Sequence, residues 1–469
     1  MAQIKFGTDG WRAVIAEDYT FDNVRKVSQA VADYIKDEGR DKDGIVIGYD
    51  TRFGSEHFAV AVAEVLAGNG IKSIFSDKFV PTPVISYAIT EKKAGAGVVI
   101  TASHNPPTDN GFKFKPYYGG SASPEIVAEL EKRLDHEIKR MPFAQAQSSG
   151  LVEYFDASAS YIEQLGRVVD LEGIKQSKLN IMVDPMWGAG QGYFPRILGG
   201  GKVTVGQIHG ERNPLFPGMH NPEPIAKNLN DLMDLMKDSD SDLGIANDGD
   251  ADRVGIVDET GRFMNQLEVY ALLALYMLEV RGERGPMVKS LSTTSMAEKL
   301  GKLYGVEVYE TPVGFKHIGP KMMATNAIIG GEESGGFGFR GHIPERDGIL
   351  SGLMIADMMV KLKKSASGLL EYLFEKVGPH YYDRIDFTFE QARREEIIDR
   401  LKTNPPKTIA GMPVVRSRTD DGFKYYSEDG SWLLIRFSGT EPIMRVYTET
   451  SSPEKVRQML EQGRSMTGA

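Results

Sequence analysis

Short apolar runs alternate with stretches of helical periodicity over most of this 469-residue chain. Residues 45–49, 71–75 and 97–101 form mostly apolar runs, which are typical of strands buried on both faces of a parallel sheet. Residues 56–66 lie between the first two runs and space their apolar positions as a helix does. Further strand-like runs follow at 179–184, 242–246 and 254–258. This succession predicts mostly parallel α/β layers, with functional loops at the carboxyl ends of strands.

The pattern changes after the Gly378-Pro379 pair. A charged amphipathic helix is predicted at 390–401, and a last helix begins at Pro453 with Ser452 as its N-cap. Strands are predicted between and around these helices, at 384–389, 424–426, 432–437 and 444–448. These elements form a smaller α+β module.

Two further domain boundaries are predicted in residues 1–377. Residues 141–150 are polar and rich in small residues, so we interpret them as a linker. A second join falls near 261–266, after a strand and its turn. Three or four domains are expected at this length, and the predicted domains are 1–150, 151–263, 264–377 and 378–469.

Composition narrows the functional classes. Apolar residues make up 41% and charged residues 26%, as in ordinary globular proteins, and no apolar run approaches the roughly 18 residues of a membrane helix. The absence of cysteine excludes disulfides and thiolate chemistry. Residues 1–10 lack a signal-peptide pattern, so we expect a cytoplasmic protein. A net charge of −10 argues against nucleic-acid binding, and an anionic substrate would require a local basic cluster.

The first loop with candidate chemistry is Thr101-Ala102-Ser103-His104-Asn105-Pro106-Pro107, directly after a predicted strand. Its position makes Ser103 a candidate nucleophile, although a serine hydroxyl requires a neighbouring base or a metal for activation. A Ser/Asn turn before proline is common without any function. Taken alone, the segment favours that turn.

The second loop, Asp248-Gly249-Asp250-Ala251-Asp252-Arg253, follows the predicted strand at 242–246. Three carboxylates at alternating positions can direct oxygen ligands at one hard cation, which suits Mg²⁺. An EF-hand calcium loop is the main rival, with Glu259 at its twelfth position. That rival requires glycine where Arg253 stands, and helices instead of strands on both sides. The loop therefore predicts a metal site at Asp248, Asp250 and Asp252.

Two more loops carry polar groups on glycine-containing turns. Residues 330–336 read Gly-Gly-Glu-Glu-Ser-Gly-Gly, whose carboxylate and hydroxyl groups can bind sugar hydroxyls, although a turn without function is nearly as good an explanation. Residues 436–442 read Arg-Phe-Ser-Gly-Thr-Glu-Pro, with Arg445 just beyond. Arginine, hydroxyls and free amides of this kind form phosphate sites, whereas the alternative is an exposed polar hairpin.

The four loops together, in this order and one per predicted domain, resemble those of the α-D-phosphohexomutase superfamily, which includes phosphoglucomutases and phosphomannomutases. The similarity extends over essentially the whole chain, beginning at Gly7-Thr8-Asp9-Gly10-Trp11-Arg12. It implies three similar α/β domains with mixed, mostly parallel sheets and a smaller C-terminal α+β domain around a central cleft. It also implies one Mg²⁺ per chain and glucose 1,6-bisphosphate as activator.

The resemblance gives roles to individual residues. Ser103 carries the phosphoryl group and ligates the metal together with Asp248, Asp250 and Asp252. Substrate is bound through a sugar loop (residues 330–336) and a phosphate loop (residues 436–442), by Lys316, Glu332, Ser334, Arg436, Ser438, Gly439, Thr440 and Arg445. Cations beside these loops are expected to converge on the cleft, namely Arg12, Lys113, Arg253, Lys316, Arg436 and Arg445. Among them Arg12 and Arg253 are expected to be catalytic.

His104 and Lys113 are candidates for proton transfer, and a lysine base would need a lowered pKa. The Glu332-Glu333-Ser334 form is similar to that of glucose-preferring members, whereas dual glucose/mannose enzymes typically have Glu-Met-Ser-Gly-His. Gly336 therefore stands where those relatives have an active-site histidine.

We therefore expect interconversion of glucose 1-phosphate and glucose 6-phosphate through a phosphoserine and glucose 1,6-bisphosphate. A glucose-1,6-bisphosphate synthase, a phosphomannomutase or phosphoglucosamine mutase, and a non-catalytic sugar-phosphate-binding protein stay open as alternatives. We expect hexose phosphates as partners, no nucleic acid or membrane, and a monomer or homodimer.

Overall fold

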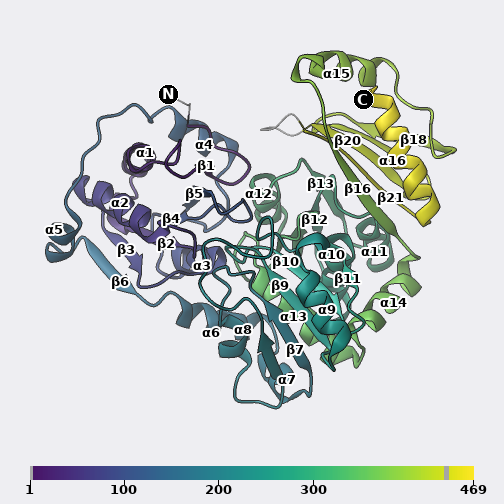
Figure 1. Ribbon diagram of the computed structural model, residues 1–469, viewed down its shortest axis with the longest axis horizontal. Coiled ribbons are helices and arrows are strands. Elements are labelled where there is room, and N and C mark those ends of the chain that lie inside the picture. The colour runs from purple at the N-terminus through teal and green to yellow at the C-terminus, as the bar shows by residue number, and fades with distance from the viewer. Residues whose placement is uncertain (1–3, 438–442, 469) are drawn as a thin grey trace.

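Three α/β units in succession and a C-terminal antiparallel sheet make up the chain (Figure 1). The computed structural model describes residues 4–437 and 443–468. The four-domain architecture with mixed sheets confirms the predicted fold class.

The first sheet has the strand order β1-β5-β4-β2-β3-β6. Parallel pairing joins β4 (Ala96–Ile100), β2 (Ile45–Tyr49), β3 (Ser73–Ser76) and β6 (Val152–Phe155). The strands β5 (Asp109–Pro116) and β1 (Trp11–Val14) are antiparallel to their neighbours. Every residue of β2 and β4 is buried, in agreement with their apolar sequences.

The predicted linker at 141–150 is wrong. Helix α5 (Phe143–Ser148) occupies most of it, and Ala146 on this helix is buried in the core of the first unit. Strand β6 then pairs with β3, so the first sheet extends past residue 150 to Phe155. Short polar helices of this kind depend on such packing, which the local sequence does not reveal.

The second and third sheets repeat the arrangement of the first. The second has the order β11-β10-β9-β7-β8 and the third β13-β12-β14-β15. In each unit one central strand pairs in parallel with the strand that leads into a chemical loop, and that strand pairs antiparallel with the next. Their strands are β7 (Asn180–Asp184), β8 (Thr204–Gln207), β9 (Leu243–Asn247), β10 (Val254–Asp258), β11 (Phe263–Met264), β12 (Met287–Ser290), β13 (Val308–Thr311), β14 (Ile329–Gly331) and β15 (Phe337–Phe339).

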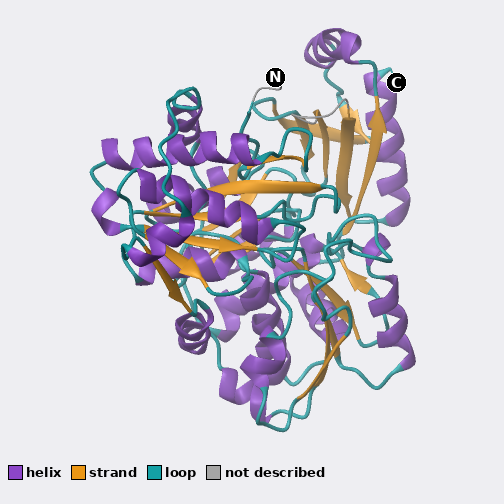
Figure 2. Ribbon diagram, turned by 60° about the vertical axis from the view of Figure 1, so that its left-hand side comes forward, coloured by secondary structure: helices purple, strands orange, loops and turns teal. Residues whose placement is uncertain are grey.

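Helices pack around the sheets of the three units (Figure 2). The long helix α13 belongs to the third unit by sequence but contacts β9 and β10 of the second. One apolar core therefore runs through all three units, from Val46 to Val377. Their helices are α1 (Phe21–Asp37), α2 (Ser55–Gly68), α3 (Thr82–Glu91), α4 (Pro124–Glu131), α6 (Ser158–Val168), α7 (Leu171–Gln176), α8 (Tyr193–Leu198), α9 (Asn230–Asp238), α10 (Gln266–Leu275), α11 (Met296–Tyr304), α12 (Phe315–Thr325), α13 (Gly348–Leu362) and α14 (Ala366–Val377).

The C-terminal sheet is antiparallel throughout and has its own apolar core. Helix α16 (Pro453–Thr467) begins as predicted, because the Ser452 hydroxyl accepts a hydrogen bond from the Lys455 backbone N–H. Helix α15 (Arg394–Thr403) begins later than expected, after a 3₁₀ turn at Gln391–Arg393. The strand order is β16 (Tyr381–Thr388), β21 (Ile443–Thr450), β20 (Trp432–Phe437), β19 (Phe423–Ser427), β18 (Met412–Arg418) and β17 (Thr408–Ile409).

Within residues 4–437 and 443–468, no helix combines the length and apolar character that crossing a bilayer requires.

Candidate functional site

The chemical loops of the three units meet because they follow equivalent strands. Ser103 comes after β4, Asp248 after β9 and Glu332 after β14. Beside them opens a cleft of about 510 Å³ that is lined by residues of all three units and of the C-terminal sheet. The predicted site residues that line it are Arg12, His104, Arg253, Glu332, Ser334, Arg436 and Arg445.

Ser103 is fully buried and donates a 2.7 Å hydrogen bond from Oγ to Oδ2 of Asp248. Its backbone has a positive φ of 53°, an uncommon conformation for serine that the surrounding loop has to maintain. The Nδ1 atom of His104 lies 3.5 Å from the same hydroxyl. Burial, together with the nearby cations Arg253 and Arg12, holds the pKa of His104 well below its usual value. The imidazole is therefore neutral beside the hydroxyl.

Arg52 supports the serine loop and was not predicted from the sequence. Its side chain is fully buried, paired with Asp50 at 3.3 Å, and its guanidinium donates to four backbone carbonyls. The shortest of these bonds, 2.6 Å each, reach the carbonyl oxygens of Ser103 and Asn105. One arginine thus satisfies most of the polar backbone beneath the serine.

The three aspartates of the second loop form a compact, fully buried cluster. One carboxylate oxygen from each of Asp248, Asp250 and Asp252 lies within 4.8 Å of the others. Oδ1 of Asp250 and Oδ1 of Asp252 have no hydrogen-bond partner although they are buried. Burial and repulsion by the other two carboxylates raise the pKa of Asp248 well above its usual range. Unpartnered buried oxygens of this kind fit a hard cation.

Lys113 lies among these aspartates. Its Nζ is 2.7 Å from Asp250 and 2.8 Å from Asp252, and 2.9 Å from Asp9. Burial alone would lower the pKa of Lys113, but the three carboxylates outweigh it and raise the pKa above its usual value. A lysine base needs the opposite shift, which these three carboxylates do not provide, and a role of Lys113 in proton transfer stays a prediction.

Arg346 is a second buried cation that the sequence analysis missed. It contacts Asp252 at 2.8 Å and Asp9, and its Nη1 is 3.7 Å from Glu332. A side chain at position 336 would meet the Arg346 side chain at 2.2 Å. Gly336 therefore leaves room for an arginine that joins the metal loop to the sugar loop.

One side of the cleft is built by neighbouring strands of the C-terminal sheet. Arg436 on β20 stands directly opposite Arg445 on β21, and Arg384 on β16 was not predicted. The predicted residues Ser438, Gly439 and Thr440 lie outside the described residues.

The basic cluster that an anionic ligand requires is present in this acidic protein. Of the six cations expected to converge, four line the cleft, Lys113 lies among the aspartates, and Lys316 is not among the lining residues. Lys316 sits half-buried on the first turn of α12 instead. Three further cations line the cleft without having been predicted, namely Lys227, Arg346 and Arg384.

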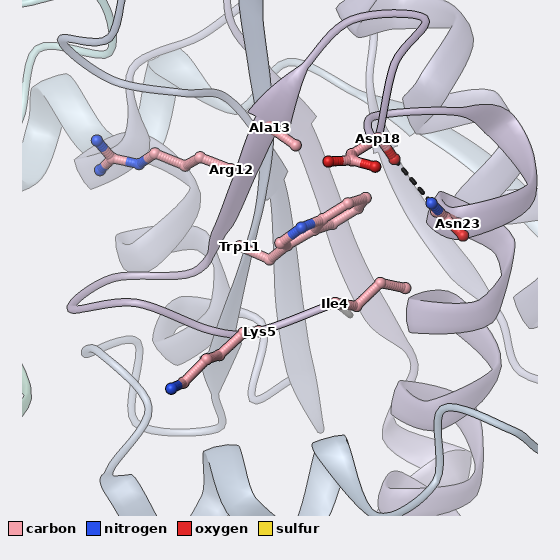
Figure 3. A pocket seen from close by; sticks show the side chains of 7 residues that line it. All are labelled: Ile4, Lys5, Trp11, Arg12, Ala13, Asp18 and Asn23. Carbon is pink, nitrogen blue, oxygen red and sulfur yellow. Dashed lines mark hydrogen bonds between the residues drawn. The ribbon is translucent and has the colours of Figure 1, made fainter. Parts of the chain in front are cut away.

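A second hollow of about 210 Å³ lies near the N-terminus and contains none of the four loops (Figure 3). Its lining includes Trp11, Arg12 and Ala13 of β1, and the Arg12 guanidinium points away from the side chains of Trp11 and Ala13. Strand alternation thus turns Arg12 towards the cleft, where it donates a 2.7 Å bond to Asn105.

Comparison with known protein families gives four matches along the chain. They are phosphoglucomutase/phosphomannomutase α/β/α domain I at 3–141, domain II at 159–261, domain III at 266–377 and the C-terminal domain at 398–464.

Individual relatives cover nearly the whole chain. A phosphoglucomutase/phosphomannomutase of Thermococcus kodakarensis is 33% identical over 98% of this chain and 97% of its own. A phosphoglucomutase of Komagataeibacter xylinus is 30% identical, over 96% of this chain and 87% of its own. A crystal structure from Thermus thermophilus, assigned as a phosphomannomutase, superimposes with a TM-score of 0.86 at 35% identity over 100% of both chains. A phosphoglucosamine/phosphogalactosamine mutase of Sulfurisphaera tokodaii is 29% identical over 95% of this chain and 94% of its own.

Proposed function

The chain belongs to the phosphoglucomutase/phosphomannomutase family and is a phosphohexomutase, and from this premise we propose that it interconverts glucose 1-phosphate and glucose 6-phosphate. Ser103 is the proposed phosphoryl carrier. The observation that supports it best is the 2.7 Å hydrogen bond from its hydroxyl to Asp248, directly before the cleft-lining His104 and beside two carboxylate oxygens that have no partner.

The proposed cycle starts with phosphorylated Ser103. Arg436 and Arg445 hold the phosphate of glucose 1-phosphate, so that its 6-hydroxyl faces the serine. The bond between phosphorus and the serine oxygen breaks as the bond to the sugar 6-oxygen forms, which gives glucose 1,6-bisphosphate. The bisphosphate turns over in the cleft and returns its 1-phosphoryl group to Ser103, leaving glucose 6-phosphate. In the first transfer His104, 3.5 Å from the serine oxygen, takes the proton of the 6-hydroxyl and passes it to the serine oxygen that is released. In the return transfer it takes the serine proton and passes it to the sugar 1-oxygen.

Asp248, Asp250 and Asp252, with an oxygen on Ser103, would hold Mg²⁺. When bound, the cation neutralises charge on the phosphoryl group during transfer. Lys113 and Arg346 offset part of the negative charge of Asp250 and Asp252, which reduces the repulsion between these carboxylates.

Glucose is proposed as the sugar because the sugar loop carries the Glu-Glu-Ser sequence at 332–334. The Gly314 backbone N–H donates to Glu332 at 2.9 Å, which fixes one glutamate of this loop at the cleft. Arg346 fills the space that a histidine at position 336 would need. The glutamate at 333 and the glycine at 336 support a glucose-type site over a dual glucose/mannose site, whereas Glu332 is common to both forms of the loop.

The test is product analysis with wild-type protein and Ser103→Ala. Wild type should equilibrate glucose 1-phosphate with glucose 6-phosphate when given Mg²⁺ and catalytic glucose 1,6-bisphosphate, and intact mass should show one phosphate on the chain. Ser103→Ala should lose both and keep its unfolding temperature. Full activity in Ser103→Ala would refute the proposal.

The substrate is tested in the same assay. Accumulation of free bisphosphate with fructose 1,6-bisphosphate as donor would identify a synthase instead. Faster turnover of mannose or glucosamine phosphates than of glucose phosphates would change the sugar assignment.

A further inference from the structure

We propose that Glu333, the second glutamate of the sugar loop, is a positioning residue that orients the phosphate-binding arm. The arm is defined here as the C-terminal sheet with its helices, residues 381–468. This inference rests on the proposed function insofar as Arg436 and Arg445 of the arm bind the substrate phosphate.

All hydrogen bonds and ion pairs of the Glu333 side chain among the described residues are made to the arm. Its Oε1 accepts a 2.6 Å hydrogen bond from the hydroxyl of Tyr382 and a 3.1 Å bond from Nη1 of Arg384. Both partners lie at the beginning of β16, a few residues after the chain enters the arm. The neighbouring Glu332, in contrast, accepts from Gly314 within its own unit. The two glutamates of the loop thus face different parts of the molecule.

Asp386 links Arg384 to Arg445, one of the two arginines proposed to bind the substrate phosphate. Nε of Arg384 lies 2.9 Å from Asp386, and the other oxygen of Asp386 is 3.4 Å from Nε of Arg445. Asp386 and Arg445 are also direct cross-strand neighbours on β16 and β21. An alternating chain of charges therefore links Glu333 in the sugar loop to Arg445.

A second bridge runs in parallel and reaches the other arginine. Nε of Arg436 donates to Oδ1 of Asp421 at 2.9 Å, and Oδ2 of Asp421 accepts from the backbone N–H of Val313 at 2.7 Å. Val313 precedes α12 and lines the cleft. Each phosphate-binding arginine is thus connected through a carboxylate to a loop of the third unit. A change in the separation of the sugar loop and the phosphate site strains the first bridge, and a change in the separation of the Val313 loop and that site strains the second.

Other contacts also join the arm to the third unit. Glu449 accepts from Thr294 and Ser295, and Glu310 pairs with Lys424 at 2.8 Å, and none of these residues lines the cleft. An apolar cluster packs Leu267 and Leu291 against residues of the arm, among them Tyr447, which does line the cleft. These contacts attach the arm, whereas the Glu333 bridge connects it directly to the sugar loop.

The test uses the absence of cysteine from the chain. Exposed Lys302 on α11 and Lys402 on α15 are replaced by cysteine and spin-labelled, and pulsed electron paramagnetic resonance gives the distance distribution between arm and body. The distribution should be narrow in the parent and clearly broader with Glu333→Met. Glu333→Gln should be intermediate, because its amide oxygen still accepts from Tyr382. The control is Glu371→Met at an exposed position on α14, which should match the parent.

Kinetics separate positioning of the arm from a contact with the sugar. Glu333→Met should raise KM for glucose 1-phosphate about five- to tenfold with little change in kcat, as expected for a partly exposed ion pair. The inhibition constant of inorganic phosphate should rise by the same factor, because phosphate has no sugar that Glu333 could contact.

An unchanged distance distribution in Glu333→Met would overturn the inference, as would unchanged inhibition by phosphate or an equal effect of Glu371→Met. If the parent protein fails to turn over glucose phosphates, the proposed function fails. The distance measurement and phosphate binding by calorimetry then still decide the role of Glu333.

Discussion

Replacing Gly249 by alanine should separate the serine loop from the metal loop with little effect on the rest of the fold. Gly249 lies between Asp248 and Asp250, and a Cβ atom at this position would be 2.4 Å from the backbone oxygen of Ser103. Real Cβ contacts essentially never fall below 3.0 Å, so one loop has to move by at least about 0.6 Å. The obstacle is backbone, which cannot rotate away as a flexible side chain would.

Both loops resist this movement. The Ser103 oxygen accepts a 2.6 Å bond from the buried Arg52, and such charge-assisted bonds are worth about 1.5–3 kcal/mol. Overpacking in a well-packed region typically costs about 1–3 kcal/mol of folding free energy. A displacement near 1 Å in a catalytic constellation lowers the rate by about a hundredfold. We therefore expect kcat to fall by roughly ten- to a hundredfold, with a loss of unfolding free energy of about 2 kcal/mol.

The assay is conversion of glucose 1-phosphate, coupled to oxidation of glucose 6-phosphate, together with urea denaturation. Gly190→Ala is the matched control, because a Cβ there meets Ala251 only at the ordinary distance of 3.4 Å. It is buried in the same neighbourhood and should keep nearly full activity. Wild-type kcat in Gly249→Ala, or an equal loss in Gly190→Ala, would refute the reasoning.

Three further perturbations follow from the buried charges. Asp250→Asn should raise the Mg²⁺ concentration for half-maximal activity at least about tenfold, and an unchanged metal titration would contradict the metal site. Arg52→Lys should lower unfolding free energy by about 2–4 kcal/mol in urea denaturation and reduce activity, because one ammonium cannot reach four carbonyls; equal stability would contradict this. Glu310→Gln should destabilise the protein by about 3 kcal/mol at pH 7, because it leaves Lys289 and Lys424 buried without their shared carboxylate. The two lysines outweigh burial and lower the pKa of Glu310, so the stabilisation by Glu310 is complete above about pH 4.5 and is lost as the pH falls below that value. The unfolding free energies of wild type and Glu310→Gln should therefore converge in acid. A difference in unfolding free energy that does not change with pH would contradict the role of Glu310.

Strand positions and the meeting of the loops could be predicted from the sequence, because local hydrophobic pattern and sheet topology determine them. Strands 45–49 and 254–258 have the predicted bounds, because uniformly apolar runs have few alternatives to a buried sheet. The loops at Ser103, Asp248 and Glu332 meet as expected of loops that follow equivalent strands.

The missed residues depend on partners that are distant in sequence. Arg52 binds carbonyls more than fifty positions away, and Arg346 contacts Asp9 from 337 positions along the chain. Nothing in the sequence neighbourhood of either arginine distinguishes it from an exposed cation. Lys113 was identified as part of the site, but the direction of its pKa depends on carboxylates that only the tertiary structure brings together. Lys316 was expected in the cleft as a cation beside the chemical loops, but it lies on the first turn of α12, next to the cleft-lining Phe315.

The arrangement of the apolar cores has a consequence for where the molecule tolerates change. One core runs through the three units that carry the serine, metal and sugar loops, the first unit has a second core besides, and the arm has a core of its own. A large-to-small substitution in the continuous core leaves a cavity that borders elements of all three units. The same substitution in the core of the arm leaves its cavity among the strands that carry Arg436 and Arg445. Repacking is therefore expected to affect the reacting groups more when it falls in the continuous core than when it falls in the arm.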